Sequence, residues 1–206
     1  MNNFWLPRAL EESRARGFLG PGAIDPQIDH AQGFAASWES IMPAPPTSFI
    51  DLGSGGGLPG LVLLERWKTR GVLIDSMEKR IAFLQEVLTW AGAPSDAEVI
   101  LGRAELLARR EDLEGKFELV TARSFGPPAV TAECAVRFLT LNGVLIVSEP
   151  PNDNQNRWNA GELSSLGLEL GQRVRHEFSY QLLRKVASTP RRYPREVGIP
   201  GKNPLF

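Results

Sequence analysis

Glycines and carboxylates occur together in the first half of the chain. In Asp51-Leu-Gly-Ser-Gly-Gly-Gly-Leu-Pro-Gly60, an acidic residue precedes a G-x-G-x-G turn formed by Gly53, Gly55 and Gly57. Backbone N–H groups at such a turn, and at the helix N-terminus that follows it, approach a ligand closely and favour its electronegative atoms. Asp75 comes 22 residues after Gly53, where a carboxylate can accept hydrogen bonds from ribose hydroxyls. This spacing predicts a site for a nucleotide-like cofactor.

The pattern of the turn separates two classes of cofactor. Dinucleotide dehydrogenases favour G-x-G-x-x-G, whose third glycine lets the helix pack close to the strand. Here the third glycine comes one residue early and Leu58 follows it. The Asp51 carboxylate would repel a pyrophosphate, whereas it can help to hold the amino group of S-adenosylmethionine. Asp75 suits either cofactor, and a purely structural glycine turn is a third interpretation. The sequence favours S-adenosylmethionine.

Strands and helices alternate from residue 48 onward. Strands are expected at 49–52, 71–75, 98–101, 117–121 and 143–148, and helices near 59–69, 78–91, 128–139 and 156–166. The runs 168–174 and 178–186 read as two consecutive strands with a tight connection, so the last pair is expected to be antiparallel. We therefore predict an α/β fold with a three-layer, Rossmann-like, doubly wound sheet. It has seven mostly parallel strands, and the last strand is reversed.

This pattern divides the chain into three regions. Residues 1–47 are a short N-terminal extension with helices expected at 6–17 and 26–41, residues 48–187 are the main domain, and 188–206 are a C-terminal tail. From Arg184 to Phe206 there are six Lys or Arg against one acid, Glu196. A basic segment on a chain of net charge −1 is a candidate electrostatic footprint for nucleic acid.

Composition limits the remaining classes of protein. A length of 206 residues suits one domain with appendages. The lone Cys134 excludes an internal disulfide framework and a multi-cysteine zinc site, and it fits a reducing cytoplasm. No apolar run reaches transmembrane length, and the first residues lack the pattern of a signal peptide. We expect a cytoplasmic monomer that holds no metal and does not enter a membrane.

Several motifs together resemble one protein family. The glycine turn is followed by Asp75-Ser-Met-Glu-Lys-Arg80, Gly102-Arg-Ala-Glu105 and Thr121-Ala-Arg-Ser-Phe125, and then by an ending that runs from Arg192 to Leu205. In this order and spacing, over about 49–206, the motifs resemble the glucose-inhibited division protein B family. Those proteins are bacterial methyltransferases of the class I, S-adenosylmethionine-dependent fold, and they methylate N7 of a guanine in small-subunit ribosomal RNA. The resemblance implies the same cofactor and activity here, with ribosomal RNA or the small ribosomal subunit as partner.

The resemblance also implies residues that hold the cofactor. Gly53 and Leu58 would contact it through the backbone, as part of the turn that includes Asp51, Gly55 and Gly57. Asp75 would take the ribose, and Ala104 and Glu105 would flank the adenine. Arg123 would reach the cofactor or the edge of the substrate.

A second set of residues would act on the RNA. Lys79 and Arg123 would position the substrate, and no general base is expected, because guanine N7 carries a free lone pair at neutral pH. The cations implied to bind RNA are Arg103, Arg191, Arg192, Arg195 and Lys202.

Some of these residues have a second interpretation. Glu105 can be a solvated residue in the first turn of a helix, and Arg103 a surface arginine. Lys79 and Arg80 open a helix, where cations oppose the helix dipole, so this position favours a functional role for one of them. Phe125 either stacks on a base or belongs to the core. Cys134, within a helix, is expected to be a packing residue rather than a nucleophile.

Two departures from the family pattern leave the substrate open. The fifth strand of the family usually ends in Leu-Lys-Gly with the lysine facing the substrate, whereas here it ends in Ser148-Glu149-Pro150. The N-terminal region is short and keeps only a trace of the family pattern around His30, which is otherwise a capping or partly buried residue. Two alternatives follow: a methyltransferase of this fold that acts on another RNA or a small molecule, and a non-catalytic RNA-binding relative.

Overall fold

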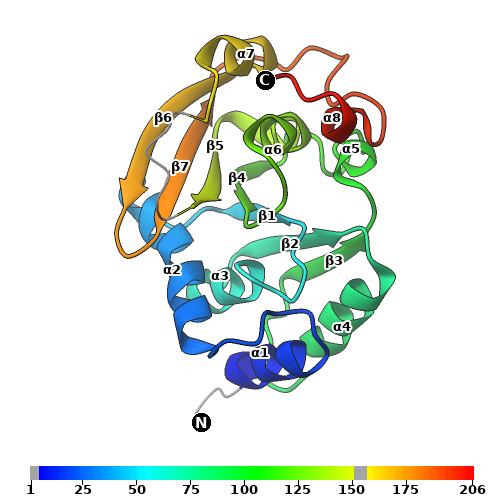
Figure 1. Cartoon of the computed structure of the whole chain (residues 1–206). Coiled ribbons are helices and arrows are strands. Elements are labelled where there is room, and N and C mark those ends of the chain that lie inside the picture. The colour runs from blue at the N-terminus through cyan, green and yellow to red at the C-terminus, as the bar shows by residue number, and fades with distance from the viewer. Residues whose placement is uncertain (1–4, 151–156) are drawn as a thin grey trace.

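The computed structural model describes residues 5–150 and 157–206, which form a seven-stranded sheet with helices on both faces (Figure 1). The strands are β1 (Ser48–Leu52), β2 (Arg70–Asp75), β3 (Ala97–Leu101), β4 (Phe117–Ala122), β5 (Leu139–Glu149), β6 (Leu168–Arg175) and β7 (Ser179–Lys185). The helices are α1 (Trp5–Ala15), α2 (Asp25–Glu39), α3 (Gly60–Trp67), α4 (Glu78–Leu88), α5 (Ala104–Leu107), α6 (Pro128–Ala135), α7 (Ala160–Leu166) and α8 (Ile199–Lys202).

The sheet is parallel except for its last strand. The strand order is β3-β2-β1-β4-β5-β7-β6, and among the described strands β7 alone runs antiparallel to its neighbours, β5 and β6. All five residues of β1 are buried, as expected for a central strand covered on both faces. The predicted α/β fold with a reversed last strand is confirmed. The strand order changes direction between β1 and β4, and open α/β sheets bind ligands at such a switch point.

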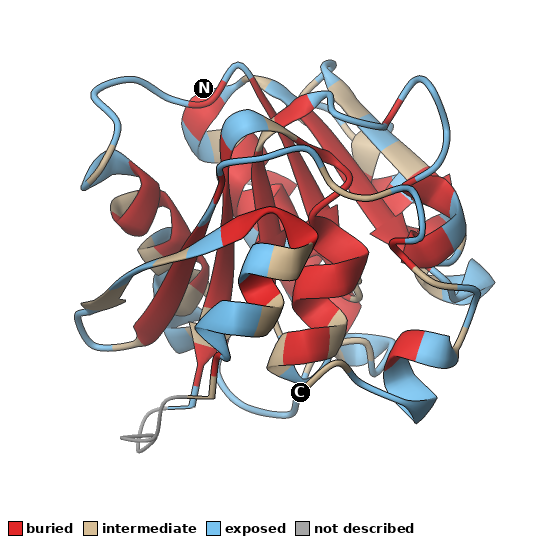
Figure 2. Ribbon diagram, turned by 90° about the horizontal axis from the view of Figure 1, so that it is seen from above, coloured by how far each residue is buried: buried red, intermediate tan, exposed pale blue. Residues whose placement is uncertain are grey.

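Alternate residues of the strands enter two separate cores. Phe49 packs with α1, α2, α3 and α4 on one face, and its neighbour Ile50 packs with α5, α6 and α7 on the other. Figure 2 shows the buried residues concentrated in the strands between these two layers. None of the described helices is long and apolar enough to cross a membrane.

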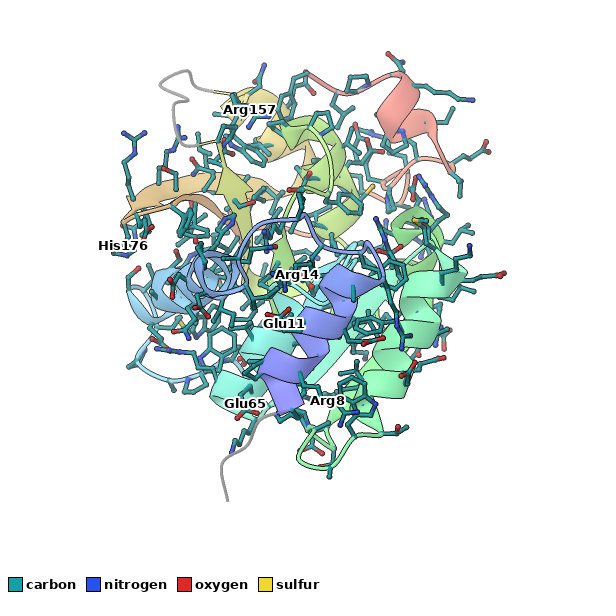
Figure 3. The ribbon with its side chains drawn as sticks, turned by 60° about the horizontal axis from the view of Figure 1, so that its bottom comes forward. Arg8, Glu11, Arg14, Glu65, Arg157 and His176 are labelled. Carbon is teal, nitrogen blue, oxygen red and sulfur yellow. The ribbon has the colours of Figure 1, made fainter. Side chains whose placement is uncertain are left out.

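The described part of the N-terminal extension, residues 5–47, shares the core of the main domain. Phe34 and Trp38 on α2 are fully buried, and the Tyr180 hydroxyl donates a 2.6 Å hydrogen bond to the backbone oxygen of His30. Trp5 at the start of α1 donates through Nε1 to Glu65 on α3 (2.7 Å). Figure 3 shows the charged side chains of Arg8, Glu11 and Arg14 along α1. The extension is therefore a fixed part of the fold.

Most predicted elements lie within a few residues of their observed bounds. The largest difference concerns 128–139, predicted as one helix: α6 ends at Ala135, and β5 begins at Leu139, which pairs with Phe117 on β4. The continuous apolar sequence predicted a longer helix. The observed boundary is set instead by the pairing of β5 with β4, which a local sequence pattern does not show. The four-residue helices α5 and α8 were not predicted, because so short an element has no hydrophobic period. Residue 156, the predicted start of the next helix, lies outside the described residues; the observed helix α7 begins at Ala160.

The C-terminal tail is docked on α5 and α6 by arginines of the main domain. Arg137, which is buried, donates to the backbone oxygens of Pro190 and Tyr193. Arg109 donates to the backbone oxygens of Arg191 (3.1 Å) and Pro194 (2.7 Å). These bonds hold the main chain of the tail, so its exposed cations project from a fixed backbone.

Candidate cofactor and substrate site

The glycine turn is tied to the carboxyl end of β2. The backbone N–H of Gly55 donates to Oδ2 of Asp75 (2.9 Å), and that of Ser54 donates to the backbone oxygen of Ile74 (2.9 Å). Oδ1 of Asp75 accepts a bond from the N–H of Met77 (2.9 Å), which precedes α4. Asp75 thus fixes both the turn and the start of the next helix at the edge of the sheet where ligands bind.

Asp51 has a structural role that differs from the predicted one. Its side chain has no exposed surface, its Oδ1 accepts from the hydroxyl of Thr121 (2.8 Å), and its Oδ2 accepts from the N–H of Gly60 (3.1 Å). Burial raises the pKa of Asp51 to about 6, against the opposing effect of the hydrogen bonds. Asp51 is fully buried and is not among the described residues that line the two cavities below, so it fixes the start of α3 from inside the protein.

The three glycines of the turn have different roles. Gly53, with φ of 66°, lines two cavities, and a side chain there would meet the ring of Phe125. Gly55 lines one cavity. Gly57 is found at neither cavity; its φ is 101°, and a Cβ there would collide with Leu61. Gly57 therefore allows the close packing of Leu61, and its contact with a cofactor stays a prediction.

The first cavity has a volume of about 230 Å³ and lies at the carboxyl ends of β1, β2 and β3. Its described walls combine acidic, basic, glycine and apolar residues: Gly53, Ile74, Asp75, Ser76, Arg80, Gly102, Arg103, Ala104, Glu105, Ser124, Phe125, Val130, Cys134 and Gly201. The wall that carries the Asp75 carboxylate also includes the apolar residues Ile74 and Val130. This combination suits a sugar with two hydroxyls joined to a flat aromatic base. The cavity brings together Asp75, Ala104 and Glu105, three of the residues expected to hold the cofactor.

Glu105 connects this cavity to the C-terminal tail. It is only 4% exposed, and its Oε1 accepts from Arg103 (2.9 Å) and from the backbone N–H of Gly198 (3.1 Å). The interpretation of Glu105 as a solvated residue is wrong. Gly201 of α8 also lines the cavity, so the tail completes a wall that begins at β3.

A second cavity of about 210 Å³ lies over the glycine turn, under the N-terminal extension. It shares Gly53, Arg80 and Ser124 with the first cavity, so the two are neighbours. Its other described walls are Phe18, Leu19, Gly20, Gln27, Ser54, Gly55, Gly56, Leu58 and Arg123. These described lining residues include two arginines and no acid, which favours a ligand rich in oxygen acceptors.

Of the two cations that open α4, Arg80 faces the site. Its Nη1 lies 3.3 Å from Oδ2 of Asp75, and it lines both cavities. Lys79, the residue expected to position the substrate, is exposed and is found at neither cavity. The geometry therefore favours Arg80 as the cation beside the cavities, and a role for Lys79 toward the substrate stays a prediction.

Arg123 lies at the end of β4 and lines the second cavity, as its position in the sequence predicted. Its Nη2 donates to Oε1 of Gln27 (3.4 Å), and its Nη1 is buried without a hydrogen-bond partner among the described residues. Burial lowers the pKa of Arg123, and the nearby charge of Asp51 opposes that shift. Gln27 and Phe18, which share this cavity, were not predicted, because nothing in their local sequence marks them.

The cations predicted to bind RNA fall into two groups. Arg191, Arg192 and Lys202 are exposed on the docked tail, and the side chain of Arg103 is 51% exposed beside the first cavity. Arg195 differs, because its guanidinium pairs with the fully buried Glu133 (2.7 Å) and its backbone N–H binds the same carboxylate (2.7 Å). Arg195 therefore holds the tail on α6, and its contact with RNA stays a prediction.

His30, Phe125 and Cys134 complete the residues singled out in the sequence. His30 stacks on Phe178, with ring centroids 4.6 Å apart, and burial together with the charge of Arg123 lowers its pKa to about 4. Phe125 is half-buried at the first cavity. Cys134 lies on the same wall but is 1% exposed, and burial raises the pKa of its thiol, which fits packing and not nucleophilic attack.

Comparison with known proteins decides the family. The family description rRNA small subunit methyltransferase G (GidB) matches residues 30–160. Ribosomal RNA small subunit methyltransferase G of Dictyoglomus thermophilum is 31% identical over 165 residues, which cover 76% of this chain and 68% of that protein. The chain belongs to the GidB family. The GidB relative of the same name from Fervidobacterium nodosum is 29% identical over 163 residues, covering 76% of each chain.

Solved structures share the fold of this GidB chain at low identity. A variant of MtNAS in complex with S-adenosylmethionine matches with a TM-score of 0.59 at 11% identity, covering 89% of this chain and 76% of that one. The cyclase SpnF matches with a TM-score of 0.56 at 11% identity, covering 77% and 81%. Because a fold hosts several reactions, these neighbours establish the architecture and not the activity.

Glu149 departs from the GidB pattern without placing a free charge at the site. It is 7% exposed; its Oε2 accepts from Arg157 (2.9 Å), whose position is labelled in Figure 3, and its Oε1 accepts from the indole N–H of Trp158 (2.8 Å). Both oxygens of the carboxylate thus have hydrogen-bond partners within the protein. The interpretation that Glu149 faces a different substrate has no support from this geometry.

Proposed function

We propose that this chain is an S-adenosylmethionine-dependent methyltransferase that modifies N7 of a guanine in small-subunit ribosomal RNA. The observation that carries the proposal is the pair of adjoining cavities at the carboxyl edge of the sheet, one with the Asp75 carboxylate and one with two arginines and no acid among its described lining residues. Membership in the GidB family supports the ribosomal substrate.

The residues of the first cavity fit the adenosine part of the cofactor. Asp75 would accept bonds from the ribose hydroxyls, and Ala104 and Glu105 would flank the adenine. Gly53 in the turn and Leu58 just after it line the second cavity and would contact the cofactor through their backbone groups. When bound, S-adenosylmethionine supplies a methyl group on a positively charged sulfur.

The second cavity fits a reaction that needs no general base. Guanine N7 is unprotonated near neutral pH, so the protein has only to align it with the methyl group and exclude water. The basic side chains among the described lining residues are those of Arg80 and Arg123, and a guanidinium has no acceptor for a proton. Arg123 can meet the cofactor or the edge of the guanine, while a bidentate contact from an arginine to both O6 and N7 would block the reaction.

Exposed cations would hold the RNA. Arg103 lies on the wall of the first cavity, and Arg191, Arg192 and Lys202 are exposed on the docked tail, so each can contact a phosphate group. Exposed Lys79 belongs with this group. We further propose that the chain acts as a monomer in the cytoplasm, where it meets ribosomal subunits.

Transfer of a labelled methyl group tests this proposal. Small ribosomal subunits from a strain that lacks this methylation are incubated with the protein and labelled S-adenosylmethionine, and large subunits serve as the control. Label is expected in small-subunit RNA alone. If the protein binds S-adenosylhomocysteine in a calorimeter but labels neither subunit, the ribosomal substrate is refuted; if it does not bind S-adenosylhomocysteine, the methyltransferase assignment itself is refuted.

A further inference from the structure

The second cavity collects hydrogen-bond donors that lack an acceptor. Nη1 of Arg123 and Nε of Arg80 are buried and make no hydrogen bond to any described residue, and both side chains line the cavity. A buried donor without an acceptor costs free energy, more so when it is charged. No acid among the described lining residues offers a partner. The cavity is therefore arranged for a group that brings its own oxygen atoms.

Gln27 adds another donor, and Arg123 fixes its orientation. A guanidinium has no acceptor, so only the amide oxygen of Gln27 can face it, as the 3.4 Å contact from Nη2 to Oε1 shows. The amide nitrogen is then directed elsewhere, and among the described residues it has no acceptor. Gln27 is half-buried on the cavity wall, in the first turn of α2. Its Nε2 group is available to a ligand.

We propose that Gln27 and Arg123 together bind the carboxylate of the methionine part of the cofactor. This inference rests on the proposed function. With adenosine in the first cavity, the methionine part continues past Gly53 and Ser124, which both cavities share, into the second. A carboxylate presents one oxygen to Nη1 of Arg123 and the other to Nε2 of Gln27, as charge-assisted bonds. Through Gln27, the N-terminal extension completes the cofactor site.

Two ligands that differ in the amino-acid part test the proposal. The full chain is titrated calorimetrically with S-adenosylhomocysteine and with 5′-methylthioadenosine, which lacks that part. Gln27→Ala is expected to weaken S-adenosylhomocysteine binding about tenfold, as for the loss of one bond to a charged group, and to leave methylthioadenosine binding within about twofold. Gln27→Glu is expected to lose more of the first affinity and none of the second, because it places a negative charge opposite the carboxylate.

Gln32→Ala is the matched control. It makes the same change on the same helix, at an exposed side chain that is not among those found at either cavity, and it is expected to alter neither affinity. Thermal melting of each variant confirms that it is folded.

Several results would overturn the proposal. Equal losses for both ligands in Gln27→Ala would show a general disturbance of the site. Unchanged S-adenosylhomocysteine binding with slower methyl transfer to RNA would assign the Gln27 donor to the substrate guanine. Wild-type protein that binds both ligands equally well would refute only the carboxylate subsite, whereas wild-type protein that binds neither would refute the proposed function.

Discussion

At the scale of single residues, Asp75 combines support of the glycine turn with a place on the cavity wall. Asp75→Asn keeps the shape and one acceptor oxygen but loses the charge that strengthens bonds to the ribose hydroxyls. We expect S-adenosylhomocysteine to bind about 10- to 100-fold more weakly, measured by calorimetry. Asp96→Asn, an exposed position before β3, is the control and should bind normally. Equal affinity in Asp75→Asn and wild type would mean that another residue holds the ribose.

Arg80 and Lys79 are neighbours in the sequence with different surroundings. Arg80 lines both cavities and contacts Asp75, whereas Lys79 is exposed. We expect Arg80→Ala to weaken S-adenosylhomocysteine binding about tenfold and Lys79→Ala to leave it unchanged, since only the first loses a charged contact at the cavity. The reverse order of effects would contradict the position of α4 described above.

The raised pKa of the buried Asp51 carboxyl group should make the stability of the protein depend on pH. Burial raises its pKa in the folded protein to about 6, above its usual 3.8, so the folded state holds the proton more tightly than the unfolded state does. The resulting stabilisation is present below about pH 4 and is lost as the pH rises through about 6. Relative to Asp51→Asn, the free energy of unfolding of the wild type should fall by about 2 kcal/mol between about pH 4 and pH 7.

Urea unfolding at the two pH values measures this difference. Comparison with the variant removes the effect of other titrating groups, such as His30. Burial lowers the pKa of His30 to about 4, so its contribution to the pH dependence of stability has the opposite sign. A difference between wild type and Asp51→Asn that stays constant with pH would contradict an elevated pKa.

At the scale of elements, the C-terminal tail contains arginines of two kinds: Arg195 holds the tail on the main domain, and exposed Arg192 is proposed to bind RNA. Arg195→Ala leaves the fully buried Glu133 without its ion pair and should destabilise the protein by about 3–5 kcal/mol. Arg192 is exposed and contacts only the ring of Tyr193 among the described residues, so Arg192→Ala should change stability by less than about 0.5 kcal/mol.

RNA binding should show the reverse pattern for these two arginines. Arg192→Ala should weaken binding to small-subunit ribosomal RNA at low salt and lower the salt slope by about one. Chemical unfolding and filter binding give the two readouts. Normal RNA affinity in Arg192→Ala would show that Arg192 on the tail does not bind RNA. Normal stability in Arg195→Ala would show that Arg195 does not hold the tail on the main domain.

The sequence predicts those elements whose signals are local. The turn after β1 and the carboxylate after β2 are adjacent in sequence to the strands that place them, so Gly53 and Asp75 could be assigned to one site in advance. The phase of α4, which turns Arg80 rather than Lys79 inward, depends on packing, because neighbouring helical residues face different directions. Gln27 reaches Arg123 and Arg195 reaches Glu133 only through the tertiary fold, so no local pattern reveals these pairs.

At the scale of the whole molecule, elements far apart in sequence enclose one site. The N-terminal extension covers the second cavity through Phe18 and Gln27, and the tail reaches the first through Gly201. Between them, the carboxyl edge of the sheet supplies the glycine turn and Arg123. In this arrangement the proposed cofactor site lies inside the molecule, and the cations proposed to bind RNA are exposed on its surface. It also assigns the N-terminal extension a part in the site.

The most direct test identifies the methylated nucleoside. Small subunits labelled by the wild-type protein are digested to nucleosides and analysed by mass spectrometry, with Asp75→Asn as the variant weakened in cofactor binding. We predict 7-methylguanosine as the labelled product, at a lower yield with Asp75→Asn when the cofactor is limiting. Label in any other nucleoside, or no label from wild-type protein that binds S-adenosylhomocysteine, would contradict guanine N7 methylation.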